Sequence, residues 1–166
     1  MILVHSAGLR LAFVENGVFN GVLTGRLDAT RQEPSIPILT APIAEKLDRD
    51  AATLPTAEIA GYLQDQLGQR IAAHLVDLRD AKQIGRYRKA DGPIPNQTTD
   101  LRLREGYKIV RMIVDAFDAN TAKAWLFGTN TRLDDAAPVD VLRRAAEPTR
   151  FAEVRAAARQ LVSFEG

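Results

Sequence analysis

The segment from Gln69 to Pro95 constrains the fold of this chain more than any other. It contains two short runs of apolar residues at helical spacing, and the second run is followed by Asp91, Gly92, Pro93 and Pro95, which end a helix. The first run comprises Ile71, Ala72, Leu75 and Leu78, and the second comprises Ala81, Ile84 and Gly85, with Arg79 and Asp80 at the turn between them. This arrangement predicts a helix-turn-helix.

Further helical patterns lie on both sides of this segment. Thr56 is placed to cap a helix that Gly68 ends, with Ile59, Leu63 and Leu67 on its apolar face. Downstream we predict a core helix over 101–117, a short helix over 122–127, a helix that begins at Pro138 and a last helix from Thr149. We therefore expect a mainly α fold, in which a helix-turn-helix unit is fused to a small helical bundle.

The first 55 residues do not share this helical pattern. Apolar runs flank Glu15, Asn16 and Gly17, which is typical of a β-hairpin, but a loosely ordered extension fits the same residues. Pro34, Pro37 and Pro42 then favour an extended linker. The predicted organisation is an irregular or hairpin-bearing extension over 1–55, a DNA-binding unit over 56–98 and a helical domain over 99–166.

Composition argues against several kinds of site. The chain has no cysteine and only two histidines, so we expect no disulfide, no thiolate metal site and no metal cofactor. Asp134 and Asp135 are adjacent carboxylates that we expect to serve the helix beginning at Pro138 rather than to act as an acid-base pair. No phosphate-binding glycine loop or nucleophile motif is present, so an enzyme is not expected.

No apolar run approaches the roughly 20 residues that span a bilayer, and a cytoplasmic protein is the expectation.

Positive charge is concentrated in the middle of the chain. Residues 69–111 carry 10 Lys or Arg against 5 Asp or Glu, whereas residues 1–68 carry 5 against 8 and residues 112–166 carry 7 against 8. A local basic field of this kind attracts phosphates. The candidate DNA-binding residues are Arg79, Lys82, Gln83, Arg86, Arg88 and Lys89.

Among these residues we assign different contacts. Gln83 is suited to adenine and Arg86 to guanine, while Arg79, Arg88 and Lys89 are suited to phosphates. The alternative is that these residues form the solvated basic face of an ordinary surface helix.

The C-terminal run WLFGTNTRLDDAAPVDVLRRAAEPTRFAEVRAAARQLV resembles the toxin-binding domain of Xre/MbcA/ParS antitoxins. The features that carry the resemblance are Trp125, the turn with Gly128, Asn130 and Leu133, the helix opened by Pro138 with Leu142, and Val154 in the last helix. The preceding helix-turn-helix is similar to that of the mycobacterial branch. Two features depart from the family pattern: Arg143, Arg144 and Ala145 replace a glycine-containing loop, and the N-terminal extension has no counterpart.

The resemblance implies an antitoxin that binds a RES-domain toxin, an NAD-degrading enzyme, and covers the entrance of its active site. On this basis the toxin-binding candidates are Arg155, Arg159, Phe164, Glu165 and Gly166. Arginine suits bidentate pairing across an interface, and an aromatic residue beside a carboxylate suits a nucleotide pocket. The alternative for the last helix is that its residues are core and its tail is frayed; we expect Phe151, Val154, Ala158 and Leu161 to be core.

The function predicted from the sequence is therefore an antitoxin with two partners, its cognate toxin and operator DNA, acting as a homo-oligomer or as a hetero-oligomer with the toxin. A stand-alone helix-turn-helix transcriptional regulator with a C-terminal dimerisation or ligand-sensing domain is the alternative. A third possibility is an interaction module that has lost DNA binding.

Overall fold

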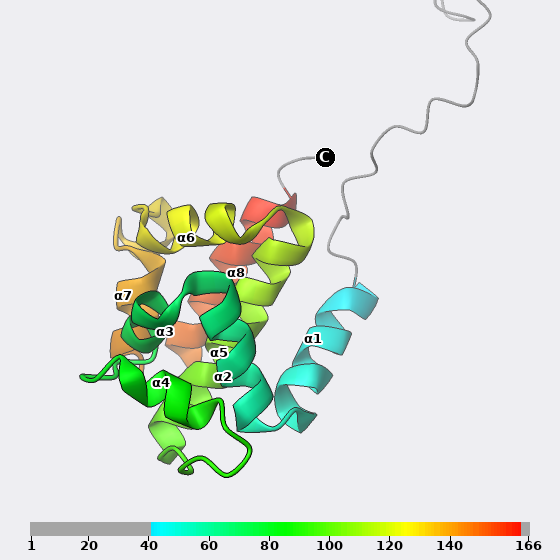
Figure 1. Ribbon diagram of the computed structural model, residues 1–166. Helices are drawn as coiled ribbons and strands as arrows, with labels where there is room; N and C mark the ends of the chain where they lie inside the picture. Colours follow the sequence, from blue (N-terminus) through cyan, green and yellow to red (C-terminus); the bar gives the residue numbers. More distant parts are fainter. Residues whose placement is uncertain (1–40, 164–166) are drawn as a thin grey trace, which may run out of the picture. The chain divides into compact units, whose positions relative to one another are not determined.

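The computed structural model describes residues 41–163, and these residues form a mainly helical structure (Figure 1). This confirms the prediction of a mainly α fold. The helices are α1 (Ala41–Thr53), α2 (Thr56–Leu67), α3 (Gln69–Leu75), α4 (Lys82–Tyr87), α5 (Gln97–Ala116), α6 (Ala119–Phe127), the 3-10 turn η1 (Thr131–Leu133), α7 (Pro138–Arg144) and α8 (Pro148–Ser163). The hairpin predicted at Glu15 to Gly17 lies outside the described residues.

Helix α1 corrects the prediction of an irregular extension that reaches residue 55. Leu47 and Ala51 of α1 are buried in the common core. Pro42 is the second residue of the helix, a position where its missing N–H has no intrahelical partner to lose. The extended linker predicted from the prolines was therefore wrong at Pro42, because a proline in the first turn is compatible with a helix.

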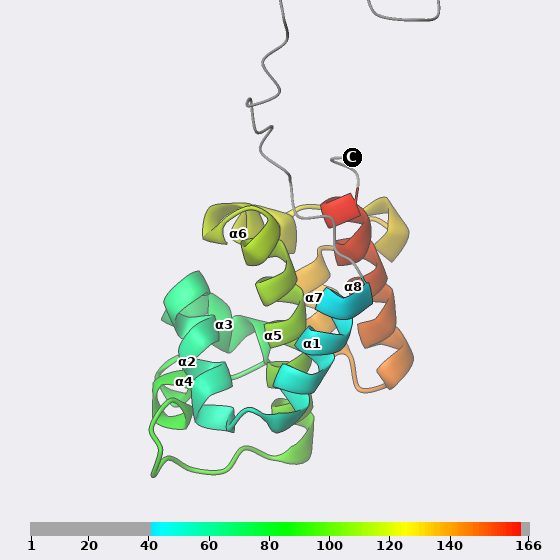
Figure 2. The ribbon, with the colours of Figure 1, turned by 90° about the vertical axis from the view of Figure 1, so that its right-hand side faces the viewer.

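Polar contacts hold α1 on α5. Arg104 Nη1 donates to the carbonyl oxygens of Ala51 at 2.6 Å and Leu54 at 3.3 Å, so it satisfies acceptors at the C-terminal end of α1. Lys108 Nζ lies 3.4 Å from Asp48 Oδ1. The view in Figure 2 shows α1 running alongside α5.

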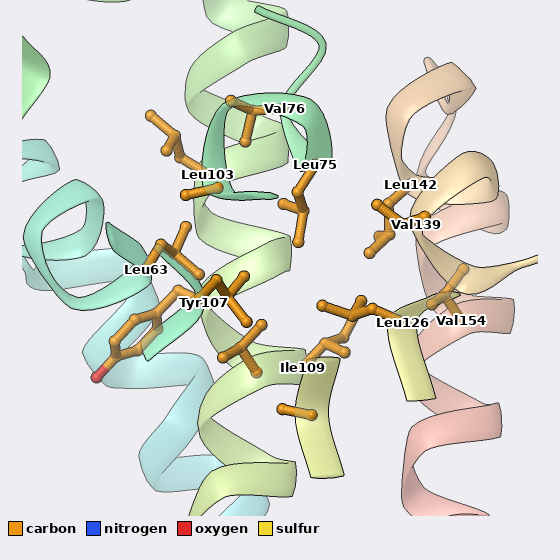
Figure 3. Packing of buried hydrophobic residues seen from close by; sticks show 14 of the residues in the cluster. Leu63, Leu75, Val76, Leu103, Tyr107, Ile109, Leu126, Val139, Leu142 and Val154 are labelled. Atoms are coloured by element: carbon orange, nitrogen blue, oxygen red, sulfur yellow. The ribbon is translucent and has the colours of Figure 1, made fainter. Parts of the chain in front are cut away.

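The long helix α5 is the centre around which the other helices pack. Its buried residues contact α1, α2, α6 and α8, and α3 packs against both α4 and α7. Figure 3 shows the apolar cluster that results, with Leu63 of α2, Leu75 of α3, Leu126 of α6 and Leu142 of α7 contributing to it. The buried residues of α1 to α8 belong to one apolar cluster, so the helices of the predicted segments 56–98 and 99–166 share one core.

Most of the predicted apolar faces are buried. Ile59, Leu63 and Leu67 are buried on α2, and the same holds for Phe151, Val154 and Ala158 on α8, while Leu161 is partly buried. These faces were predictable because helical periodicity alone identifies the side that must leave water.

Two predicted helix caps are wrong, although α7 begins at Pro138 as expected. Pro55, not Thr56, is the N-cap of α2, and the Thr56 hydroxyl instead donates to Asp100 Oδ1 on α5 at 2.9 Å. The N-cap of α7 is Ala137, with no side-chain hydrogen bond, and neither Asp134 nor Asp135 serves that helix. Both aspartates have left-handed backbone conformations, with φ of 55° and 59°, in the turn that follows η1.

No helix within residues 41–163 is both long enough and apolar enough to cross a membrane.

Candidate functional site

The six-residue helix α4 has one face in the core and one face in solvent. Ile84 and Tyr87 are buried against the neighbouring helices α2 and α3. The carboxylate of Asp80 accepts the backbone N–H of Lys82 at 2.9 Å and so satisfies a free donor at the start of the helix. Because the apolar side faces inward, Lys82 and Arg86 lie on the exposed side.

The chain turns sharply after α4. The helix ends at Tyr87, and the backbone N–H of Gly92 donates to the carbonyl of Lys89 at 2.9 Å. A Cβ atom on Gly92 would lie 2.1 Å from the carbonyl oxygen of Arg86, so this position has no room for a side chain. The predicted helix stop near Gly92 therefore corresponds to a tight return of the backbone.

The candidate DNA-binding residues gather around this exposed face, but they are not equivalent. Arg79, Lys82, Arg86, Arg88 and Lys89 are exposed, and Gln83 is half-buried.

Arg86 and Gln83 form a pair on this face. Arg86 Nη1 donates to Gln83 Oε1 at 2.9 Å, and Arg86 Nη2 lies 3.8 Å from Asp80 Oδ2. The Arg86 side chain is 57% exposed and keeps donors free for a ligand. The pair restricts the Arg86 guanidinium before any ligand arrives, and the amide oxygen of Gln83 is occupied while the pair persists.

Arg88 differs from the other candidates because it binds α2. Its Nη2 donates to Asp65 Oδ2 at 3.2 Å, its Nη1 donates to Asp65 Oδ1, and its aliphatic stem lies over Gly61, 3.5 Å from the position of an added Cβ. A bidentate carboxylate leaves this guanidinium fewer donors for a phosphate. Sequence reasoning could not distinguish Arg88 from Lys89, since Asp65 lies 23 residues earlier in the chain.

In the C-terminal region, Arg155 has an internal partner. Its Nη1 donates to both carboxylate oxygens of Glu105 on α5, at 3.0 and 2.8 Å. Glu105 also accepts from Lys108 Nζ at 2.7 Å, and its side chain is only 10% exposed. The structure therefore places Arg155 in the contact of α8 with α5, which differs from the free partner-facing position expected of it.

Of the remaining toxin-binding candidates, the structure describes only Arg159. Arg159 is exposed near the end of α8, and Phe164, Glu165 and Gly166 lie outside the described residues.

A groove beside the end of α8 was not foreseen from the sequence. It has a volume of about 350 Å³, and its wall includes Trp125, which is half-buried rather than fully in the core. The other lining residues are Thr129, Asn130, Thr131, Arg132, Ala157, Gln160 and Leu161. Trp125 has helical spacing with the buried residue Ala122, and periodicity does not distinguish a core position from the edge of a groove.

Within residues 41–163, no group of three or more His, Cys, Asp or Glu side chains is arranged to hold a metal ion.

No protein-family model, curated protein or solved structure matches this chain in the comparisons made.

Proposed function

We propose that this protein is an antitoxin that binds duplex DNA through α4 and captures a RES-domain toxin through the end of α8. The observation that supports the DNA part is the two-sided character of α4. Its buried residues Ile84 and Tyr87 fix it on α2 and α3, and the opposite side presents Lys82 and Arg86 to solvent. A short helix that packs on its neighbours through one side and carries long hydrogen-bond donors on the exposed side suits the major groove of DNA.

On this proposal, α3 and α4 act as a helix-turn-helix. Arg86, restrained by Gln83, is the base-reading candidate, and Arg79, Lys82 and Lys89 contact phosphates. Arg88 holds α4 on α2 instead, through Asp65.

The toxin part is supported by the resemblance of the run that begins at Trp125 to antitoxin domains. Around that run, exposed Arg159 and the groove beside Trp125 lie at the same end of α8. We assign toxin contact to Arg159 and to the tail Phe164 to Gly166, and we assign Arg155 to the internal contact with Glu105.

Binding of the full chain to duplex DNA at several salt concentrations tests the DNA part. Affinity should fall steeply as salt rises because bound Lys and Arg displace counterions from phosphates. Lys82→Ala should weaken binding and make the salt slope shallower by about one unit. Arg150→Ala is the control, since Arg150 is exposed but pairs with Glu153 at 2.6 Å on α8. Salt-independent binding, or an equal loss in the control, contradicts the assignment.

Co-expression with a RES-domain protein encoded by the neighbouring open reading frame tests the antitoxin part. We expect this protein to prevent growth arrest and NAD loss, and Arg159→Ala to weaken that protection more than Arg150→Ala on the same helix. Growth arrest and NAD loss in the presence of soluble wild-type protein would show that it is not the antitoxin. A DNA-binding protein that fails this experiment would fit the stand-alone regulator.

A further inference from the structure

One carboxylate in the segment that joins α3 to α4 lies between arginines from two other helices. Asp77 Oδ1 is 3.4 Å from Arg143 Nε on α7, and Asp77 Oδ2 is 3.6 Å from Arg102 Nη1 on α5. These contacts are ion pairs rather than well-formed hydrogen bonds, since Arg143 Nε is buried without a hydrogen-bond partner among the described residues. We call Asp77, Arg102 and Arg143 the Asp77 clamp.

The two arginines are themselves held in place. Arg102 is 13% exposed, and its Nε donates to the carbonyl of Ala145, the residue that follows α7, at 3.3 Å. Arg143 Nη1 lies 3.4 Å from His74 Nδ1 on α3. The clamp therefore connects the end of α3 to α5 and α7.

The backbone at Asp77 adopts a left-handed conformation. Asp77 has φ of 61°, and it follows α3 at a position where glycine is favoured. The N–H of Leu78 donates to the carbonyl of Ala73 at 2.9 Å and the N–H of Asp77 to that of His74 at 3.1 Å, which is the hydrogen-bond pattern of a Schellman motif. Glycine would adopt this conformation without strain, but it has no carboxylate to offer Arg102 and Arg143.

This segment leads directly into α4. Helix α4 has only six residues and packs on α2 and α3 through Ile84 and Tyr87, so the contacts of the segment add a second anchor at its start. On the α3 side, the ring of His74 stacks on Phe127 of α6 at a centroid distance of 6.2 Å. The connection from α3 to α4 therefore has side-chain contacts with α5 and α7 through Asp77, and the end of α3 contacts α6 through His74.

We propose that Asp77 is a positioning residue for DNA binding: by pairing with Arg102 and Arg143 it holds the α3–α4 connection on α5 and α7, and so sets the orientation of the basic face of α4. This inference rests on the proposed DNA-binding function. Asp77 does not contact DNA itself, because a carboxylate is repelled by phosphates.

The sign of the effect on affinity separates positioning from simple electrostatics. Asp77 is 52% exposed and lies two positions before Arg79, a candidate phosphate contact, in the chain. If only its charge mattered, removing it would strengthen DNA binding. Positioning predicts the opposite result, because the freed connection must be ordered again when α4 binds.

The test measures the affinity of full-length Asp77→Asn and Asp77→Gly for duplex DNA at several salt concentrations. Asparagine keeps the tolerance for this backbone conformation without the charge, and glycine also relieves the strain. We expect both variants to bind about fivefold more weakly, a change of the size that ordering a freed segment produces. The salt slope should stay unchanged because no phosphate contact is lost. The thermal midpoint of Asp77→Gly should remain close to that of the wild type.

Asp134 provides the matched control. It has φ of 55° at an exposed turn, and it makes no ion pair with another described residue. Asp134→Asn and Asp134→Gly should therefore leave DNA affinity unchanged. Arg143→Gln should weaken binding as Asp77→Asn does, and the double variant should be no weaker than the weaker single variant.

Two outcomes would overturn the proposal. One is unchanged or stronger DNA binding by Asp77→Asn and Asp77→Gly, and the other is an equal loss in the Asp134 variants.

The amide resonances of Lys82–Tyr87, measured without DNA, test the positioning role independently of the proposed DNA-binding function. They should shift in Asp77→Gly and not in Asp134→Gly. If wild-type protein fails to bind DNA, the proposed function fails, while absent amide shifts would still reject the positioning role.

Discussion

At the scale of single residues, Gly106 shows how closely the helices approach one another. A Cβ atom at this position of α5 would lie 2.4 Å from Leu75 Cδ2, and Leu75 is fully buried on α3. Its side chain is packed within the apolar cluster of Figure 3, so a shift of this side chain would displace other buried residues. Glycine at 106 therefore allows Leu75 of α3 to pack directly on the backbone of α5.

Gly106→Ala should destabilise the protein by about 1–3 kcal/mol, because an extra methyl group must displace a buried side chain. Gly85→Ala is the control: the nearest atom to its added Cβ is Gln64 Oε1 at 3.8 Å, and alanine favours a helix over glycine by up to about 1 kcal/mol. Urea unfolding of the two variants measures both changes. Equal stability of Gly106→Ala and the wild type would mean that Leu75 repacks freely.

Charged residues are the ones whose surroundings sequence reasoning judged least well. Arg88 and Arg155 were both assigned to partner surfaces, yet each forms an ion pair with a residue of another helix, Asp65 and Glu105 respectively. Glu105 is buried, which is rare for a carboxylate unless it is paired. The pairing depends on which helices meet, and residues 50 positions apart in the chain give no local signal of it.

At the scale of elements, α6 begins with a charged cap. Asp118 Oδ1 accepts the backbone N–H of Thr121 at 2.7 Å, and this hydrogen bond to the backbone lowers the pKa of the Asp118 carboxyl below its usual range. A carboxylate at this end also interacts favourably with the helix dipole. The start of α6 is therefore most stable when Asp118 is ionised.

The stability that the Asp118 carboxylate contributes depends on pH in a defined direction. Because the pKa is lower in the folded protein, the stabilisation is present above the unfolded pKa of about 3.9 and is lost as pH falls through the folded value. Asp118→Asn keeps a capping oxygen without the charge. The thermal midpoint of the wild type should exceed that of the variant at neutral pH, and the difference should disappear in acid. A difference that stays constant from pH 7 to pH 2.5 would contradict this.

At the scale of the whole molecule, the helices of residues 41–163 share one core around α5. Leu75 of α3 and Leu142 of α7 belong to the same apolar cluster, so the segment proposed to bind DNA and the segment proposed to bind the toxin are not energetically separate. The contacts of the Asp77 clamp add a polar link between the same helices.

We therefore expect these helices to unfold in a single transition. The fluorescence of Trp125, the chain's one tryptophan, reports on α6, and far-ultraviolet circular dichroism reports on all helices. In urea the two signals should have the same midpoint, because neither segment keeps its core without the other. Two separate midpoints would show that the proposed DNA-binding segment folds on its own.

By itself, the sequence determined the helical class, most helix positions after residue 55 and the faces that are buried. Thr56 to Leu67 and the helix opened by Pro138 were predictable because turn residues and apolar spacing act over a few neighbouring positions. Only the tertiary structure decided that 41–53 forms a helix, that Arg88 and Arg155 pair internally, and that Asp77 lies between Arg102 and Arg143. Such pairings follow from which helices pack together, and that packing depends on the whole core rather than on any local pattern.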